Sequence, residues 1–138
     1  MRATGSESGC LLVPGGGLMA HEALGGHTLA RHVGKSEQFL PNRLAVEPYL
    51  DLASTFFDRQ TAEDALSQLL ADNDRDVQRW LRSGSYRFTL IQKALQPVGR
   101  AIMRDVADSM PAAGMKLVLR RSSSMPTGYR IHTAMVEL

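Results

Sequence analysis

Residues 86–91 read YRFTLI, and this short stretch decides the fold class. Tyr86, Phe88 and Leu90 alternate with the three side chains between them, which is the period of two that indicates a β-strand. Three further strand candidates follow at residues 98–104, 116–120 and 129–138, with SSSMPTG as a turn between the last two. The last third of the chain is therefore predicted to form an antiparallel sheet.

The residues before this stretch show a helical period instead. Thr61 and Asp64 resemble a capping box, and the apolar residues that follow recur at helical spacing: Ala62, Ala65, Leu66, Leu69 and Leu70. A break at residues 72–74 precedes a second helical stretch with Val77, Trp80 and Leu81 on its inner face, closed by Gly84. Trp80 is interpreted as a core anchor. Helices followed by antiparallel strands predict an α+β fold.

The start of the chain differs in composition. Residues 1–19 are rich in glycine and serine and lack a period, so we interpret 1–19 as a flexible leader or linker and 20–138 as the folded domain. A short helix is predicted from about His27 to Gly34, with Leu29, His32 and Val33 on one face. Ser36 is predicted to cap a second short helix over EQFLPNRLA, which Pro41 interrupts.

Length and composition limit the class of protein. The chain has 138 residues, of which 43% are hydrophobic, enough for one compact core. Cys10 is the single cysteine, so no disulfide forms within the chain and the fold is expected to tolerate a reducing cytoplasm. No apolar run is long enough to span a bilayer. The short apolar run Leu11-Leu12-Val13 is ended by Pro14 before it could form the core of a signal peptide. We expect no membrane-spanning segment and no export signal of the chain's own.

Charge is unevenly distributed along the chain. Residues 86–138 carry 8 Lys and Arg against 3 Asp and Glu, a net charge of +5, whereas residues 1–85 carry 8 against 11, a net charge of −3. The strand-rich part is therefore the basic part. A positive sheet suits a phosphate backbone, although segregation of this size is also common on solvated surfaces.

Strand alternation divides the last segment into two faces. One face holds Tyr129, Ile131, Thr133, Met135 and Glu137, and the other holds Arg130, His132, Ala134 and Val136. His132 and Thr133 are thus expected to reach one site only if the strand bulges.

Several motifs occur in a definite order along the chain. They are HEALGGHTLARHVGKS at 21–36, RL at Arg43, ASTFFDRQTAEDAL at 53–66, the Trp80-Leu81 pair, QPVGRAIMR at 96–104 and GYRIHTA at 128–134. Over roughly residues 18–135 this set resembles the ribonuclease A-like toxin domain at the C-terminus of CdiA-type contact-dependent growth inhibition proteins. The resemblance implies a kidney-shaped α+β fold without disulfides, metal-independent cleavage of RNA, delivery into a neighbouring bacterium and a cognate immunity protein.

The resemblance also implies a set of functional residues. That family has a histidine in the first helix, an arginine shortly after it, and a threonine and a tyrosine two apart in the final strand. The first three fall on His32, Arg43 and Thr133, which are the predicted catalytic residues, and the fourth falls on Met135. Met135, Tyr129 and His27 are the candidate substrate-binding residues.

The chemistry of these groups fits an endoribonuclease. An imidazole takes and returns protons near neutral pH, and a guanidinium holds phosphate oxygens with two parallel donors. We expect His32 to transfer a proton, Arg43 to stabilise charge at phosphorus and Thr133 to orient the phosphate or base, while the RNA 2′-hydroxyl attacks to give a 2′,3′-cyclic phosphate. A thioether cannot donate a proton, so Met135 leaves the second proton-transfer group open, with His132 a candidate if the strand bulges.

Two alternatives remain beside the enzyme. Met135 favours a catalytically weak or inactive RNA-binding or protein-interaction module of the same fold. A metal-dependent nuclease is less attractive, because His21, His27 and His32 lack the adjacent-turn spacing of a zinc pair and no acidic ligand cluster accompanies them. We expect no metal and no cofactor. The expected partners are RNA, with tRNA as one candidate, and an immunity protein, and the expected location is the target bacterium's cytoplasm after secretion within a larger toxin.

Overall fold

The structure is a computed structural model that describes residues 12–26, 28, 32–35 and 39–138. In chain order its elements are α1 (Leu18–Ala23), α3 (Phe39–Val46), β1 (Leu52–Phe56), α4 (Arg59–Asp72), α5 (Asp74–Arg82), β2 (Arg87–Lys93), β3 (Gly99–Met103), β4 (Met110–Ala112), β5 (Gly114–Arg121) and β6 (Tyr129–Glu137). All the described helices precede strands β2 to β6, and β1 alone lies between helices α3 and α4. Both described sheets are antiparallel, which confirms the predicted α+β class.

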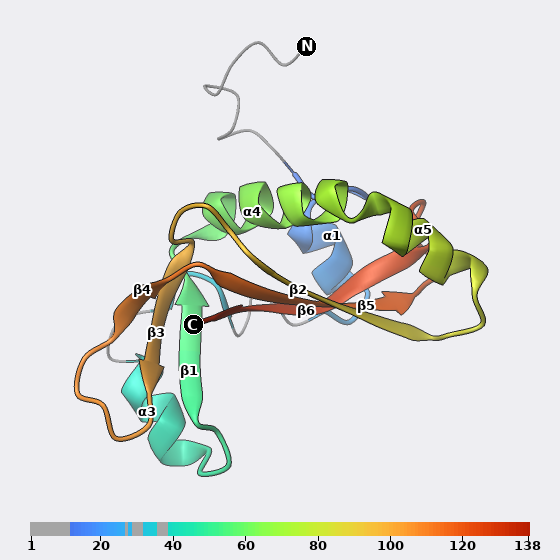
Figure 1. Ribbon diagram of the computed structural model, residues 1–138. Helices are drawn as coiled ribbons and strands as arrows, with labels where there is room; N and C mark the ends of the chain where they lie inside the picture. The colour runs from blue at the N-terminus through green and yellow to red at the C-terminus, as the bar shows by residue number, and fades with distance from the viewer. Residues whose placement is uncertain (1–11, 27, 29–31, 36–38) are drawn as a thin grey trace.

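The described strands form two antiparallel sheets instead of one. Sheet A has the order β1-β3-β4, and sheet B has the order β2-β5-β6. Ala113 alone separates β4 from β5, so the chain passes directly from sheet A to sheet B at that residue. Figure 1 shows sheet B running beneath α4 and α5, while sheet A descends from one end of it. The two sheets therefore make a V whose inner angle lies below sheet B.

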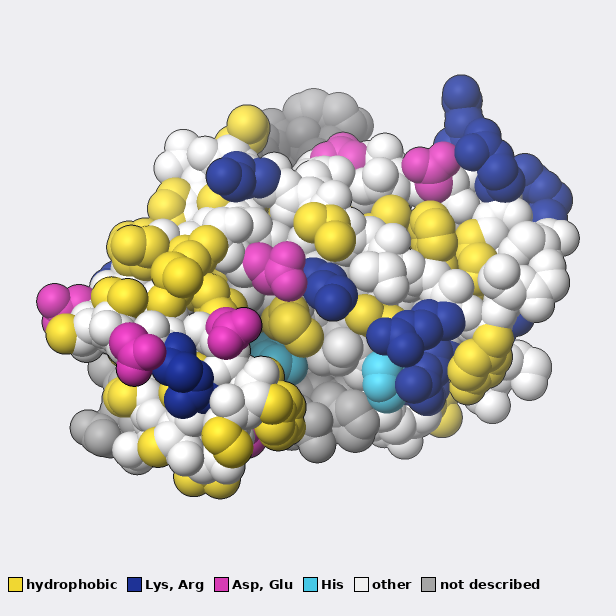
Figure 2. Space-filling model, turned by 60° about the horizontal axis from the view of Figure 1, so that its bottom comes forward, with side chains coloured by type: hydrophobic (Ala, Val, Ile, Leu, Met, Phe, Trp, Pro, Cys, Tyr) yellow, Lys and Arg dark blue, Asp and Glu magenta, His cyan; other side chains and the backbone are white. Residues whose placement is uncertain are grey.

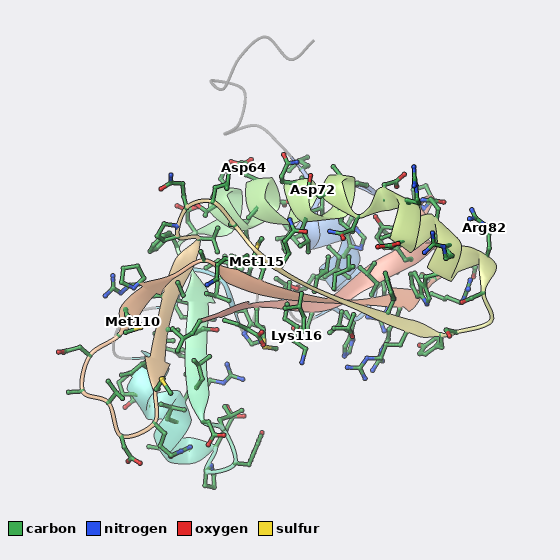
Figure 3. The ribbon with its side chains drawn as sticks, in the orientation of Figure 1. Asp64, Asp72, Arg82, Met110, Met115 and Lys116 are labelled. Atoms are coloured by element: carbon green, nitrogen blue, oxygen red, sulfur yellow. The ribbon has the colours of Figure 1, made fainter. Side chains whose placement is uncertain are left out.

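The main core lies between the helices and sheet B. The apolar stripe of α4 and α5 packs on the upper face of the sheet, with Leu66, Leu69, Val77 and Trp80 buried. The Trp80 ring stacks on Phe88 of β2 at 5.5 Å between centroids, so the predicted core role of Trp80 is confirmed. Figure 3 shows Met115 turned toward α4 and its neighbour Lys116 turned the other way. Sheet B thus has one face that packs against α4 and α5 in the core and one face that is turned away from these helices. We call the second face the open face.

The start of α4 differs from its prediction. The N-cap is Asp58, whose side chain accepts a hydrogen bond of 2.7 Å from the backbone N–H of Thr61. Thr61 is therefore the third residue of the helix and not its cap, because the carboxylate of Asp58, directly before the first helical residue, accepts the hydrogen bond from the Thr61 N–H. No helix among the described residues is long and apolar enough to cross a membrane.

The two short helices before β1 also differ in detail. Thr28 and His32 are helical, but Val33 pairs with Phe56 in a parallel bridge, so Val33 does not share a helical face with His32. Pro41 lies in the first described turn of α3 and does not break it, since a first-turn residue has no intrahelical N–H bond to lose. Leu29 and the predicted cap Ser36 lie outside the described residues.

Strands β1 and β4 were not predicted. β1 reads LASTF and is buried on both faces over its last four residues, so it carries no alternation. Its hydroxyls are hydrogen-bonded, with Ser54 donating to the carbonyl of Val136 at 2.5 Å and Thr55 accepting from the N–H of Lys35 at 2.9 Å. β4 has three residues and contains Pro111, which an edge strand tolerates.

Part of the predicted linker belongs to the core. Val13 and Leu18 are each 1% exposed, and their backbone N–H groups donate to the two carboxylate oxygens of Glu63 at 2.9 and 3.0 Å. Glu63 is itself 2% exposed on α4. The boundary predicted after residue 19 therefore does not coincide with the start of the packed fold.

Candidate active site

A β-bulge in β6 decides which side chains face which side of sheet B. Val118 of β5 is paired with Thr133, whereas the next residue, Leu119, is paired with Ile131. His132 is therefore the extra residue of the bulge. The alternation shifts there by one position, so Thr133 and Met135 lie on the open face, while Ile131 and Ala134 are in the core.

The bulge corrects the predicted faces of the last strand. Tyr129 does not share a face with Thr133, because the shift leaves Tyr129 on the core side at 5% exposure. Its ring lies 6.1 Å from that of His21, and burial raises the pKa of Tyr129 to about 12. Tyr129 is therefore a core residue, and we do not include it among the proposed substrate-binding residues.

His132 lies on the same side as the basic side chains. Its Nδ1 atom is 3.3 Å from Nη1 of Arg130, a residue that alternation places on the open face. Since Arg130 can only donate, this contact requires an unprotonated Nδ1. The condition set by the sequence is thus met: the strand bulges, and His132 and Thr133 lie on one side of it.

Strand pairing arranges the open face in three rows. They are Arg87, Arg120 and Arg130; Thr89, Val118 and Thr133; and Ile91, Lys116 and Met135. The middle row is covered at its centre, since Val118 is 1% exposed, and the Oγ1 atom of Thr133 is buried without a hydrogen-bond partner among the described residues. Figure 2 shows Lys and Arg side chains gathered around a histidine on this side of the molecule.

His32 lies beside the end of β1. It is 3% exposed, and its carbonyl is 3.5 Å from the Thr55 hydroxyl of β1. The same strand reaches β6 through the hydrogen bond from Ser54 to Val136, three residues from Thr133 along β6. His32 and Thr133 are therefore attached to neighbouring strands at the junction of the two sheets.

Arg43 lies farther along the molecule, on α3. This helix packs on β1 and β3, toward the end of sheet A that points away from sheet B (Figure 1). The Nε atom of Arg43 donates to Glu47 at 2.9 Å, and the two residues line a cavity of about 260 Å³ with Phe39, Asn42 and Val46. The guanidinium is thus held by a carboxylate one helical turn away.

The remaining candidates from the sequence are Met135, His27 and a metal site. Met135 lies on the open face opposite Lys116, and His27 lies outside the described residues. Within the described ranges, no group of three or more His, Cys, Asp or Glu side chains is arranged to hold a metal ion. The sequence analysis did not single out Arg120, Arg130 or Lys116, because only the register of three strands reveals that they share a face with Thr133.

Comparison with known proteins agrees with this architecture. Residues 26–135 match the family model described as the bacterial CdiA-CT RNAse A domain. This chain belongs to that family. The matched region includes His32, Arg43 and the whole strand up to Met135.

A solved structure supports the assignment to the CdiA-CT RNAse A family. The chain is similar to one in the crystal structure of a CdiA-CT/CdiI complex from Y. kristensenii 33638, with 31% sequence identity and a TM-score of 0.75. The similarity covers 82% of this chain and 100% of that chain. A comparison with curated proteins found no match.

Proposed function

We propose that this chain is an endoribonuclease toxin that cleaves RNA without a metal ion. The observation that carries the proposal is the bulge at His132. It brings the His132 imidazole and the Thr133 hydroxyl to the open face of sheet B, where the basic side chains lie. Membership of the CdiA-CT RNAse A family supports the substrate class.

The reaction uses a nucleophile that RNA itself supplies. A base takes the proton of the 2′-hydroxyl, and the 2′-oxygen attacks the adjacent phosphorus. The bond from phosphorus to the 5′-oxygen breaks, and an acid gives a proton to that oxygen. The products are a 2′,3′-cyclic phosphate and a 5′-hydroxyl, so the protein must supply two proton-transfer groups and donors for the charged phosphoryl oxygens.

The proposed roles follow from the chemistry of each side chain. His32 is one proton-transfer group, and the guanidinium of Arg43 stabilises the developing charge. The buried Thr133 hydroxyl has no hydrogen-bond partner among the described residues, and its proposed role is to orient the phosphate or base. Because Met135 cannot donate a proton, His132 is proposed as the second proton-transfer group. Met135 and His27 remain the proposed substrate-binding residues.

The proposed partner is an immunity protein. The related CdiA-CT structure was determined as a complex with CdiI. We propose that a cognate protein of this kind binds and neutralises this chain. An acidic surface of that protein would face the basic side chains on the open face of sheet B. The proposed biological route is secretion within a larger toxin and action in the cytoplasm of a target bacterium.

The test is direct cleavage. The purified chain is incubated with tRNA and with total RNA in excess EDTA, and the new ends are analysed. Cleavage with cyclic phosphate ends, suppressed by the immunity protein and lost in His32→Ala, is the expected result. Binding without cleavage would instead favour the inactive RNA-binding module, and cleavage abolished by EDTA would favour a metal-dependent nuclease.

A further inference from the structure

The three arginines of the first row stand directly beside one another. Arg87 is paired with Arg120, and Arg120 is paired with Arg130. Paired strands are separated by about 4.8 Å, so three guanidinium groups are attached to adjacent points across sheet B. Arg87 is exposed, and the other two are half-buried.

Other arginines of the strand-rich part have structural partners. Arg100 donates to the carbonyl of Ser109 at 2.9 Å, and Arg104 donates to the carbonyls of Leu44 and Leu50 at 2.9 and 2.8 Å. Arg121 donates to the carbonyl of Trp80 at 2.7 Å, at the C-terminal end of α5. These side chains stabilise the fold by binding backbone acceptors that a helix end or a loop leaves open.

The side chains of the arginine row have no backbone acceptor among the described residues, and their one hydrogen-bond partner there is Nδ1 of His132, 3.3 Å from Nη1 of Arg130. In the described part of the chain, ion pairs join Arg43 to Glu47 and Arg79 to Asp76, and none involves the row. Arg120 lies over the Tyr86 ring at 5.8 Å, and its Nε atom is buried without a hydrogen-bond partner among the described residues. Like charges directly opposite each other destabilise a sheet. The row is therefore costly for folding and suited to binding an anion.

The position of the row indicates which anion. Arg120 is two residues from Val118 on β5, so the row lies about 7 Å from the row of Thr133, on the same face. The Tyr86 ring beside it is 58% exposed, and an aromatic ring next to a guanidinium offers a stacking surface for a base. Phosphate donors and a stacking ring one step from Thr133 match a nucleic-acid chain that continues past the cleaved bond.

We propose that Arg87, Arg120 and Arg130 form a second phosphate-binding subsite, which holds the RNA backbone beside the phosphate that is cleaved. This inference rests on the proposed function and extends it: substrates long enough to reach the row bind more tightly than the shortest cleavable ones. The row supplies binding, and the groups around Thr133 supply chemistry.

The test compares substrates of different length. Arg87→Ala and Arg120→Gln are assayed for kcat/KM on a dinucleotide and on an RNA of about twelve nucleotides, with Arg82→Ala as the matched control. Arg82 lies at the exposed end of α5, away from the open face (Figure 3), and its replacement removes the same charge. We expect the loss on the longer RNA to be about tenfold and to exceed the loss on the dinucleotide at least about fivefold, with no such difference for Arg82→Ala.

Binding of a DNA analogue separates the two proposals. A deoxyoligonucleotide of the same length lacks the 2′-hydroxyl and cannot be cleaved, so its Kd tests the subsite even if the wild-type chain cleaves nothing. Each lost phosphate contact should reduce the slope of log K against log salt by about 0.7. Equal losses in Arg82→Ala, or weaker immunity-protein binding with unchanged oligonucleotide binding, would overturn the subsite.

Discussion

The imidazole of His21 in α1 joins the two ends of the chain, because its Nδ1 atom accepts a hydrogen bond of 2.8 Å from the backbone N–H of Ile131 in β6. An accepting Nδ1 places the ring proton on Nε2, which lies 2.8 Å from the carbonyl of Pro14 and donates to it. The side chain is buried at 1% exposure. The fold therefore requires a neutral His21 with one defined tautomer.

This requirement predicts a loss of stability in mild acid. Burial, the largest cause, lowers the pKa of His21 below 6.5, although the Pro14 hydrogen bond and Glu63 act in the opposite direction. The unfolded chain then binds a proton that the folded chain does not, so the free energy of unfolding falls as pH falls below about 6.5. Denaturant unfolding of the wild type and His21→Asn between about pH 7.5 and 5 measures the effect. The variant should be less stable at the upper end and less sensitive to pH, and parallel curves would contradict the assignment.

Replacing Thr133 with valine should separate activity from stability. The hydroxyl is buried without a partner in the described structure, so its removal should leave the free energy of unfolding unchanged or raise it by about 1 kcal/mol. Cleavage should fall at least about tenfold, since the substitution removes the hydroxyl that is proposed to orient the phosphate or base. Thr89→Val, in the same row but exposed, is the control. A destabilised Thr133→Val protein would mean that the hydroxyl has a structural role.

The role of His132 is best tested by the pH dependence of kcat/KM. Two imidazoles acting as base and acid give a bell-shaped profile. His132→Gln should remove one limb of this profile and lower the maximum about a hundredfold, whereas a merely structural histidine would lower the rate without changing the shape. Arg130→Gln removes the neighbouring guanidinium and should shift that limb while keeping it. An unchanged bell in His132→Gln would assign the second proton to another group.

Arg43 offers a matched pair of substitutions. Its ion pair with Glu47 is an i,i+4 contact near the surface, and pairs of that kind contribute about 0.3 to 0.5 kcal/mol. Arg43→Ala and Glu47→Gln should therefore have small and similar effects on thermal unfolding. Arg43→Ala alone should lower cleavage about a hundredfold to a thousandfold, because only the guanidinium is proposed to stabilise charge at phosphorus. Equal cleavage by the two variants would show that Arg43 contributes only to the stability of α3 and not to catalysis.

Elements with one buried face could be predicted from the sequence, and elements buried on both faces could not. Helices α4 and α5 and strand β2 were predicted because each buries one face, and a half-buried element leaves a period in its sequence. β1 is buried on both faces and leaves none, so its LASTF residues were not assigned to a strand. The sequence pattern predicted Thr61 as the cap of α4, but Asp58 is the residue whose side chain accepts a hydrogen bond from the first turn of the helix.

The site was predicted less completely than the fold. Residue types and motifs selected His32, Arg43 and Thr133, but the faces of β6 depend on an extra residue in its pairing with β5. No pattern within β6 marks that residue, because a bulge is a property of two strands together. The arginine row was invisible for the same reason, since its members come from three strands and meet only through register.

The contact between Glu63 and the N–H groups of Val13 and Leu18 determines how short an independently folding piece of this chain can be. A fragment beginning at residue 20 would retain a buried carboxylate stripped of both donors, and isolating such a charge costs about 3 kcal/mol or more. A shortened chain that keeps both hydrogen bonds must accordingly begin before Val13.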